Sequence, residues 1–233
     1  MTYLDPGTLA SEYLLATRTG GSRAQVLERR LAEVSEQELR QSLAGEAART
    51  AFCLNVYNAA VVRAGVVDLT SALTRWRHFR RPSVVVAGQR LSLDAIEHGL
   101  LRRSRWQLAL GYVGNPLPGR FERAFRVGRV DPRIHFALNC GAASCPPIAA
   151  YDRVHLDEQL ALAAASYLAT EIHTDDGVVR MPALLLWYIG DFGGPPGLRR
   201  LLRRSGIAGW GRPIRFTSYD WTPAPDHWLG DRD

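Results

Sequence analysis

The segment from Asp131 to Pro147 constrains the fold of this 233-residue chain more than any other stretch. Its first half alternates apolar and polar side chains, a period of two that predicts a buried β-strand over residues 134–139. On that strand, His135 and Asn139 are expected to share the face opposite the core. Small residues and two prolines follow, which predicts a loop at the end of the strand. This loop carries two of the chain's three cysteines, Cys140 and Cys145.

Helical periodicity dominates the rest of the chain. Apolar residues at helical spacing predict helices over residues 1–20, 23–43 with Ser22 as cap, 46–64, a stretch after Ser92, 157–169, a stretch after Pro182, and the Arg-rich stretch after Gly197. Alternating runs predict β-hairpins over residues 83–91, turning at Gly88-Gln89, and 171–181, turning at Asp175-Asp176-Gly177, and a final strand over 214–221. We therefore expect an α+β fold, with a mixed or antiparallel sheet packed by helices.

Composition indicates an ordinary globular chain, since 46% of the residues are apolar and 22% are charged. No internal repeat or long linker divides the sequence, so we expect residues 1–233 to form a single domain. All 29 basic residues are arginine, which excludes a lysine Schiff base, a lysine nucleophile and a P-loop lysine. The net charge is +6, and the arginine runs at residues 75–81 and 199–204 are expected to be solvated surface rather than a nucleic-acid interface.

Cellular location follows from what the sequence does not contain. The first 21 residues include Asp5 and Glu12 and no apolar run, so we do not expect them to act as a signal peptide. No stretch reaches the roughly 20 apolar residues that a membrane helix needs. Three cysteines do not describe a disulfide scaffold. We expect a cytoplasmic protein without a membrane partner.

A reactive cysteine is the strongest chemical prediction of the sequence. A thiol becomes nucleophilic as a thiolate, which requires a nearby histidine or a helix N-terminus. His135 lies on the strand that leads to Cys140, and Cys145 precedes a possible helix start. A cysteine, a histidine base and a third residue that orients the imidazole form a generalised triad. The candidates for the third residue are Glu97, Asn55 and Asn139.

Other uses of these side chains stay open. The spacing His135-x4-Cys140-x4-Cys145 differs from the Cys-x-x-Cys knuckle of structural zinc sites, so no metal is expected. Cys140 and Cys145 can form a redox pair, although Cys-x-x-Cys is the usual form, or they can be buried thiols that only pack. Cys53 is expected to be such a packing residue.

The asparagines also have two interpretations. Asn55 and Asn58 are neighbours on the surface of one predicted helix, where a polar pair among apolar residues needs hydrogen bonds. They either tie down a neighbouring loop, or one of them orients a catalytic group or binds the backbone of a substrate.

Several motifs resemble one known family. They are Phe52-Cys-Leu-Asn-Val-Tyr-Asn-Ala59, Leu91-Ser-Leu-Asp-Ala-Ile-Glu-His98 with Arg102, Asp131 to Pro147, Trp187-Tyr188 with Asp191-Phe192, and Tyr219-Asp-Trp221. Over about residues 45–221 the chain is similar to the domain-of-unknown-function 547 family, with residues 1–44 as a helical N-terminal extension. The family commonly has tryptophan where this chain has Cys53, a change expected to affect packing.

The resemblance implies one domain of helices and strands with a papain-like or transglutaminase-like thiol site. By position, its shared residues are Glu97, His98, His135, Cys140 and Cys145. We expect hydrolysis or acyl transfer at an amide bond of a peptide-like substrate through a thioester, without a cofactor. Cys140 is the favoured nucleophile over Cys145, with His135 or His98 as the proton shuttle. Residues expected to contact the substrate are Asn55, Asn58, Asn139 and Gly141, the last through a backbone amide that stabilises an oxyanion. The alternative is a non-catalytic module that binds a peptide or a small ligand.

Overall fold

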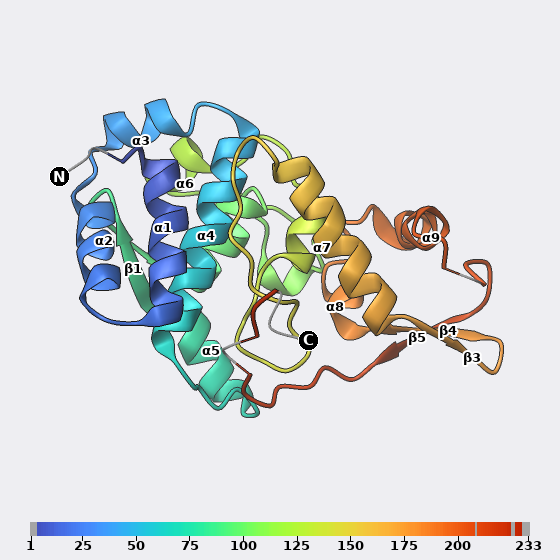
Figure 1. Ribbon diagram of the computed structural model, residues 1–233. Coiled ribbons are helices and arrows are strands. Elements are labelled where there is room, and N and C mark those ends of the chain that lie inside the picture. Colours follow the sequence, from blue (N-terminus) through green and yellow to red (C-terminus); the bar gives the residue numbers. More distant parts are fainter. Residues whose placement is uncertain (1–3, 208, 225–226, 230–233) are drawn as a thin grey trace.

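The computed structural model describes residues 4–207, 209–224 and 227–229, and in it helices surround two small β-sheets (Figure 1). The elements up to the first hairpin are α1 (Pro6–Thr19), α2 (Ser22–Glu33), α3 (Glu36–Ser42), α4 (Glu46–Ala64), α5 (Ala72–Arg80), β1 (Pro82–Val86) and β2 (Gln89–Ser92). Three short helices and α6 follow: η1 (Ala95–Leu101), η2 (Gln107–Ala109), α6 (Arg120–Phe125) and η3 (Pro132–Phe136). The last elements are α7 (Leu156–Glu171), β3 (His173–Asp175), β4 (Val178–Pro182), α8 (Ala183–Trp187), α9 (Gly194–Arg204) and β5 (Ile214–Thr217).

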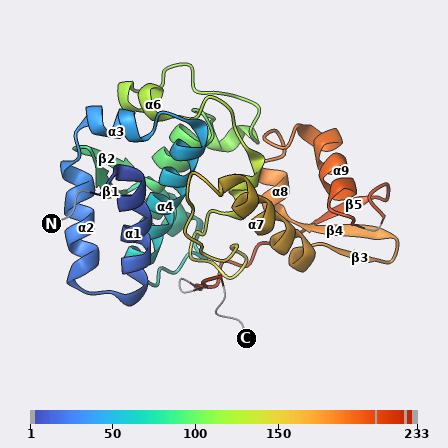
Figure 2. The same cartoon turned by 45° about the horizontal axis from the view of Figure 1, so that its top comes forward.

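Helix α4 is the centre of the fold. Every residue from Thr50 to Val61 is buried, so the helix has no solvated face along these turns. Helix α1 packs along one side of α4, and α7 crosses the other (Figures 1 and 2). The helix ends where Gly65 adopts a φ of 67°, a left-handed conformation that glycine tolerates best. This confirms the predicted helix over residues 46–64.

The helix predicted over residues 23–43 is wrong in one respect, because two helices occupy that stretch. Helix α2 ends at Glu33, Val34 turns to an extended conformation, and α3 begins at Glu36. Ser35 and Glu38 form a capping box, in which each side chain bonds the backbone N–H of the other residue. A capping box satisfies the free N–H groups of a helix start, so it begins a new helix inside an apolar pattern that runs on. The predicted cap at Ser22 is also wrong, since Gly21 occupies that position without a side-chain bond.

The sheets agree with the predicted class. Strands β1 and β2 form an antiparallel hairpin, in which Val86 pairs with Gln89 and the turn is therefore Ala87-Gly88, one residue earlier than expected. Strands β3 and β4 form the predicted second hairpin, and β5 joins β4 in parallel, which makes this sheet mixed. Figure 2 shows this mixed sheet with α9 at one end of the molecule and α1 to α3 at the other.

The predicted strand over residues 134–139 is wrong. Pro132–Phe136 forms a 3-10 helix that Asp131 caps through the N–H of Arg133, and the chain then continues without regular structure. The alternation that resembled a strand has another cause. Ile134 belongs to a core built by α1, α2 and α4, whereas Phe136 belongs to a second core built by α7, β4, α8 and α9. A segment wedged between two cores buries side chains on both sides, so its polar residues are buried as well.

Among the described residues, no helix combines the length and the apolar character needed to cross a bilayer.

Candidate functional site

Cys140 and Cys145 lie side by side where the two cores meet, and their sulfurs form a disulfide. Cys140 is partly exposed, whereas Cys145 is buried. The backbone N–H of Cys140 donates a hydrogen bond to Cys145 Sγ over 2.9 Å. The hydroxyl of Tyr219 lies 3.1 Å from Cys145 Sγ and 3.6 Å from Cys140 Sγ. The site is therefore a sulfur pair with one accessible member and hydrogen-bond donors directed at the other.

The cysteine loop is anchored by asparagines. The side chain of Asn58 donates to the carbonyl of Ala137 over 3.0 Å and accepts the N–H of Asn139 over 3.0 Å. Asn139 in turn donates to the carbonyl of Pro146 over 2.8 Å and accepts the N–H of Gly141 over 2.7 Å. These bonds tie the loop to α4 at one end and close it on itself at the other. The Gly141 N–H was expected to stabilise an oxyanion. It already donates a hydrogen bond to Asn139, which opposes that role.

Asn55 anchors a second segment in the same way. Its side chain donates to the carbonyl of Tyr151 over 2.7 Å and accepts the N–H of the same residue over 2.9 Å. Asn55, Asn58 and Asn139 have no exposed surface. The hydrogen bonds match the interpretation in which the asparagines of α4 tie down neighbouring loops; contact with a substrate stays a prediction.

The C-terminal segment covers the cysteine loop from outside. Ala143 donates to Thr222, and Ala224 donates back to Gly141, so residues 141–144 and 220–224 run alongside each other. This pairing brings Tyr219 to the sulfurs. Around it, the rings of Trp187, Tyr219 and Trp221 pack with centroids 4.7–5.7 Å apart. The disulfide thus borders a partly exposed aromatic cluster.

A buried network of charges holds the predicted acid–base residues. His135 Nε2 bonds Asp191 Oδ2 over 2.9 Å, and Arg102 Nε donates to the same oxygen over 2.6 Å. Arg102 Nη1 lies 2.7 Å from His98 Nδ1. Next to them, Tyr188 donates to Glu97 over 2.6 Å and stacks on the ring of His135. The side chains of Arg102 and Asp191 have no exposed surface, so the bond between them is shielded from water.

The protonation states of the network follow from its contacts. Arginine has donors only, so the nitrogen of His98 that faces Arg102 carries no proton and the ring is neutral. Burial lowers the pKa of both histidines, and for His135 it outweighs the bond to Asp191. Burial alone raises the pKa of Asp191, but the hydrogen bonds from His135 and Arg102 outweigh it, and the pKa falls below its usual value. The network therefore holds neutral imidazoles around the Asp191 carboxylate, which pairs with Arg102 through Oδ2 and, over 3.4 Å, with Arg105 through Oδ1.

The sequence predicted that the histidines lie beside the cysteines, but the structure separates these two groups. Within the described residues, neither His98 nor His135 has a hydrogen bond to a cysteine sulfur; Nδ1 of His98 bonds Arg102, and Nε2 of His135 bonds Asp191. Cys145 also lacks the predicted helix N-terminus, since Pro146-Pro147 continues the loop and α7 begins only at Leu156. Cys53 is buried in α4, and burial raises the pKa of its thiol to about 12, as expected for a packing residue.

Two residues that contact the candidate site residues were not assigned a role from the sequence. Tyr219 lies 74 residues from Cys145, and Asp191 lies 56 residues from His135. Both stand in motifs that carried the family resemblance, which is the only sequence signal for them. In the described part of the chain, no group of three or more His, Cys, Asp or Glu side chains is arranged to hold a metal ion.

Comparison with known proteins gives one match. The family model described as "Protein of unknown function, DUF547" matches residues 41–168, which is more than half of the 233-residue chain. Its range includes Glu97, His98, His135 and both cysteines of the loop, but it ends before Asp191 and Tyr219. No curated protein and no solved structure matches the chain significantly.

Proposed function

The chain belongs to the DUF547 family, and from the geometry of its cysteine site we propose that it catalyses thiol–disulfide exchange. One observation carries the proposal: a partly exposed cysteine is paired with a buried cysteine whose sulfur receives hydrogen bonds. We retain the cytoplasm as the proposed location. Disulfides that form in that reducing compartment are mostly transient, and they serve catalysis or redox sensing.

The two cysteines have different roles in the proposed reaction. The Cys140 thiolate attacks a disulfide of the substrate, which forms a mixed disulfide and releases the first substrate thiol. The Cys145 thiolate then attacks Cys140 Sγ, forms the internal disulfide and releases the second thiol. Two electrons pass from the dithiol to the substrate disulfide. Two external thiols restore the dithiol by the reverse route: the first attacks the accessible Cys140 Sγ and displaces Cys145, and the second attacks the resulting mixed disulfide, releases Cys140 and leaves as an external disulfide.

Hydrogen bonds to Cys145 support this division. A thiol with a lowered pKa is the better leaving group in exchange. The Cys140 N–H and the Tyr219 hydroxyl both lie within reach of Cys145 Sγ, where they stabilise a negative charge. Burial raises the pKa of Tyr219 well above its usual value, so its hydroxyl stays protonated and available as a donor. The bordering aromatic cluster offers apolar surface to a peptide that carries the substrate disulfide.

Hydrolysis or acyl transfer at an amide is the second candidate. It is favoured by the Tyr219 hydroxyl 3.6 Å from Cys140 Sγ, which is close enough to donate to an oxyanion formed on the reduced thiol. It ranks second because both imidazoles bond other groups. This candidate needs Cys140 alone, whereas exchange needs both cysteines.

Variants of the two cysteines separate the candidates. The protein is equilibrated in glutathione buffers of graded potential, the thiols are trapped with a maleimide mass tag, and reduction of a disulfide-bonded peptide is followed in parallel. For exchange, we expect Cys140→Ser to abolish turnover and Cys145→Ser to accumulate a mixed disulfide. Tyr219→Phe should slow the release of Cys145 roughly 3- to 10-fold, because it removes one hydrogen bond to a charged sulfur.

Cys53→Ala is the matched control, since it removes a buried thiol outside the pair. Exchange is refuted if glutathione never reduces the Cys140–Cys145 bond in the folded protein, because the bond is then structural. A Cys145→Ser variant that fails in exchange but cleaves amide or ester substrates at the parent rate would favour the hydrolase instead.

A further inference from the structure

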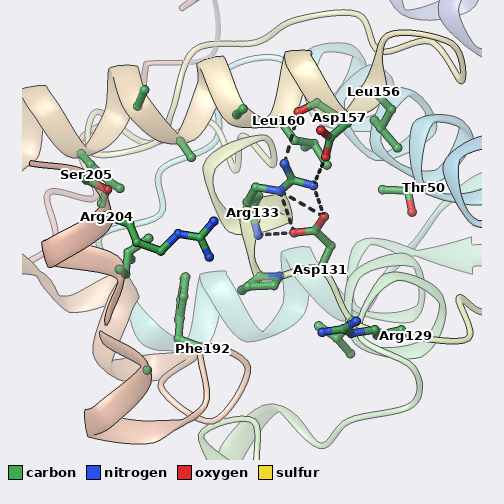
Figure 3. A pocket seen from close by; sticks show the side chains of 18 of the residues that line it. Thr50, Arg129, Asp131, Arg133, Leu156, Asp157, Leu160, Phe192, Arg204 and Ser205 are labelled. Carbon is green, nitrogen blue, oxygen red and sulfur yellow. Dashed lines mark hydrogen bonds and ion pairs between the residues drawn. The ribbon is translucent and has the colours of Figure 1, made fainter. Parts of the chain in front are cut away.

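A large cleft runs along α7, apart from the cysteine pair. Its volume is about 1160 Å³, and its walls come from α7, α9, the start of α4 and residues 129–133 (Figure 3). Tyr167 of α7 bonds the carbonyl of Ser144 in the cysteine loop, while Ala164 and Leu168 line the cleft. Of the residues that line the cleft, none belongs to the segment 139–147 or is Tyr219, so the proposed exchange reaction does not use the cleft.

The wall between α7 and α9 is apolar. Small and aliphatic side chains line it from both helices: Ala161, Ala165 and Leu168 on α7, with Leu201 on α9 and Ile207 after it. Phe192 closes the same region from below α7 in Figure 3. This strip offers a continuous surface for an apolar chain, because alanines on α7 leave room in front of the larger side chains.

Four arginines line this cleft without an ionic partner among the described residues: Arg129, Arg153, Arg200 and Arg204. The fifth, Arg133, differs from them, because Asp131 and Asp157 both pair with it. Figure 3 shows Arg204 reaching from α9 toward the middle of the cleft above Phe192, with Arg129 on the far side. A solvated arginine needs no partner, but four around one apolar cleft create a field that attracts anions.

Two arginines on α9 indicate where in the cleft the anion binds. Arg200 and Arg204 are four residues apart and share one face of the helix, where like charges repel. Helix α9 contains no acidic residue that would relieve this repulsion. A carboxylate between the two guanidinium groups would relieve it through charge-assisted hydrogen bonds.

A second depression of about 400 Å³ extends the cleft past Phe192. It shares Arg129, Val130, Pro132 and Phe192 with the larger one and adds Arg103 and Arg105. Asp191 lines it with a side chain that has no exposed surface, and Asp191 Oδ1 forms an ion pair with Arg105 Nε over 3.4 Å. The junction between the depressions is therefore lined by charged groups of both signs.

We propose that this cleft binds an amphipathic anion of the fatty-acid type, a carboxylate on a long apolar chain. The chain lies on the apolar strip between α7 and α9, and the carboxylate lies between Arg200 and Arg204. The four unpaired guanidinium groups favour a negatively charged head group. The apolar strip between α7 and α9 is covered only by a ligand that carries a long apolar chain. A compact anion leaves the strip uncovered, and a cation meets four unpaired guanidinium groups.

Three probe ligands test the proposal on the full chain by isothermal titration calorimetry at pH 7.5 and low salt. Dodecanoate, used below its micelle-forming concentration, should bind one molecule per chain. Butyrate has the same head group without the chain, and dodecyltrimethylammonium has the same chain with the opposite charge. We expect both to bind at least 10-fold more weakly than dodecanoate, because each lacks one of the two interactions.

Variants locate the site. Arg200→Gln with Arg204→Gln should weaken dodecanoate binding roughly 10- to 100-fold, the loss expected for charge-assisted hydrogen bonds. Arg203→Gln is the control, because it removes one positive charge from the same helix outside the cleft, and it should change the affinity less than about 2-fold. Ala165→Trp fills the strip from an exposed position and should abolish binding without unfolding the chain, which circular dichroism checks.

The proposal is overturned if dodecanoate does not bind at millimolar concentration. It is also overturned if the trimethylammonium probe binds as tightly as dodecanoate, or if the double arginine variant binds dodecanoate like the parent.

Discussion

Replacing Asp191 with asparagine tests the buried charge network most directly. The change keeps the shape of the side chain and removes its charge. Arg102 and His135 both bond the same carboxylate oxygen, Oδ2. Arg102 has no exposed surface, so its guanidinium cannot turn to water when the carboxylate is lost. The variant thus leaves a buried cation without its counter-ion.

The expected cost follows from this burial. Removing one partner of a buried ion pair costs about 3–5 kcal/mol, because the remaining charge stays desolvated. We expect the lower end, about 3 kcal/mol, since the amide oxygen of asparagine still accepts one hydrogen bond. For a chain of this size, each kcal/mol lowers Tm by roughly 2–4 °C, so Tm should fall by roughly 6–12 °C.

Urea denaturation at pH 7 measures the effect, with the slope m checked for constancy. Glu12→Gln is the matched control, because it removes a carboxylate that pairs with Arg23 at the surface. That exposed pair should contribute less than about 1 kcal/mol. The double variant Arg102→Met with Asp191→Leu removes both charges and should recover much of the loss.

Two results would refute this account. If Asp191→Asn costs less than about 1 kcal/mol, Arg102 is solvated or compensated and its bond to Asp191 is not shielded from water. If the double variant is no more stable than Asp191→Asn, the cost arises from shape rather than from an unpaired charge.

Three further predictions concern other parts of the chain. The unfolding free energy should be constant between about pH 6.5 and 8. Below pH 6.5 it should fall by about 1.4 kcal/mol per pH unit for each histidine that stays neutral when folded, because burial lowers the pKa values of His98 and His135 while the unfolded chain protonates near 6.5. Asp94 opposes this fall, because burial raises its pKa to about 6; urea midpoints at pH 7.5, 6.0 and 5.0 measure the sum. Asn58→Ala should cost about 1–3 kcal/mol per backbone group left unpaired and speed alkylation of the reduced loop, as mass spectrometry would show. Gly197→Ala should destabilise by about 1–3 kcal/mol, although alanine favours helices, because its Cβ would overlap the Phe192 carbonyl; an equal or higher Tm would contradict this.

The sequence by itself determined the helices and hairpins that depend on residues close together in the chain. Helix α4 follows from apolar spacing between residues 46 and 64, and the hairpin of β3 and β4 follows from alternation around Asp176-Gly177. The backbone hydrogen bonds of a helix or a tight hairpin join residues only a few positions apart, so nearby side chains determine whether these bonds form. The family motifs also selected residues that the fold gathers at its centre, including Glu97 and His135.

Only the tertiary structure decided the partners of those residues. His135 was expected beside a sulfur, but the fold presents Asp191 to it from 56 residues away. The cysteine pair receives Tyr219 from 74 residues away, because the C-terminal segment runs back along the loop. The alternation at residues 134–139 was itself a tertiary effect, produced by two cores on either side. A buried polar group takes whichever partner the packing of distant segments brings within about 3 Å, and neither periodicity nor spacing along the chain contains that distance.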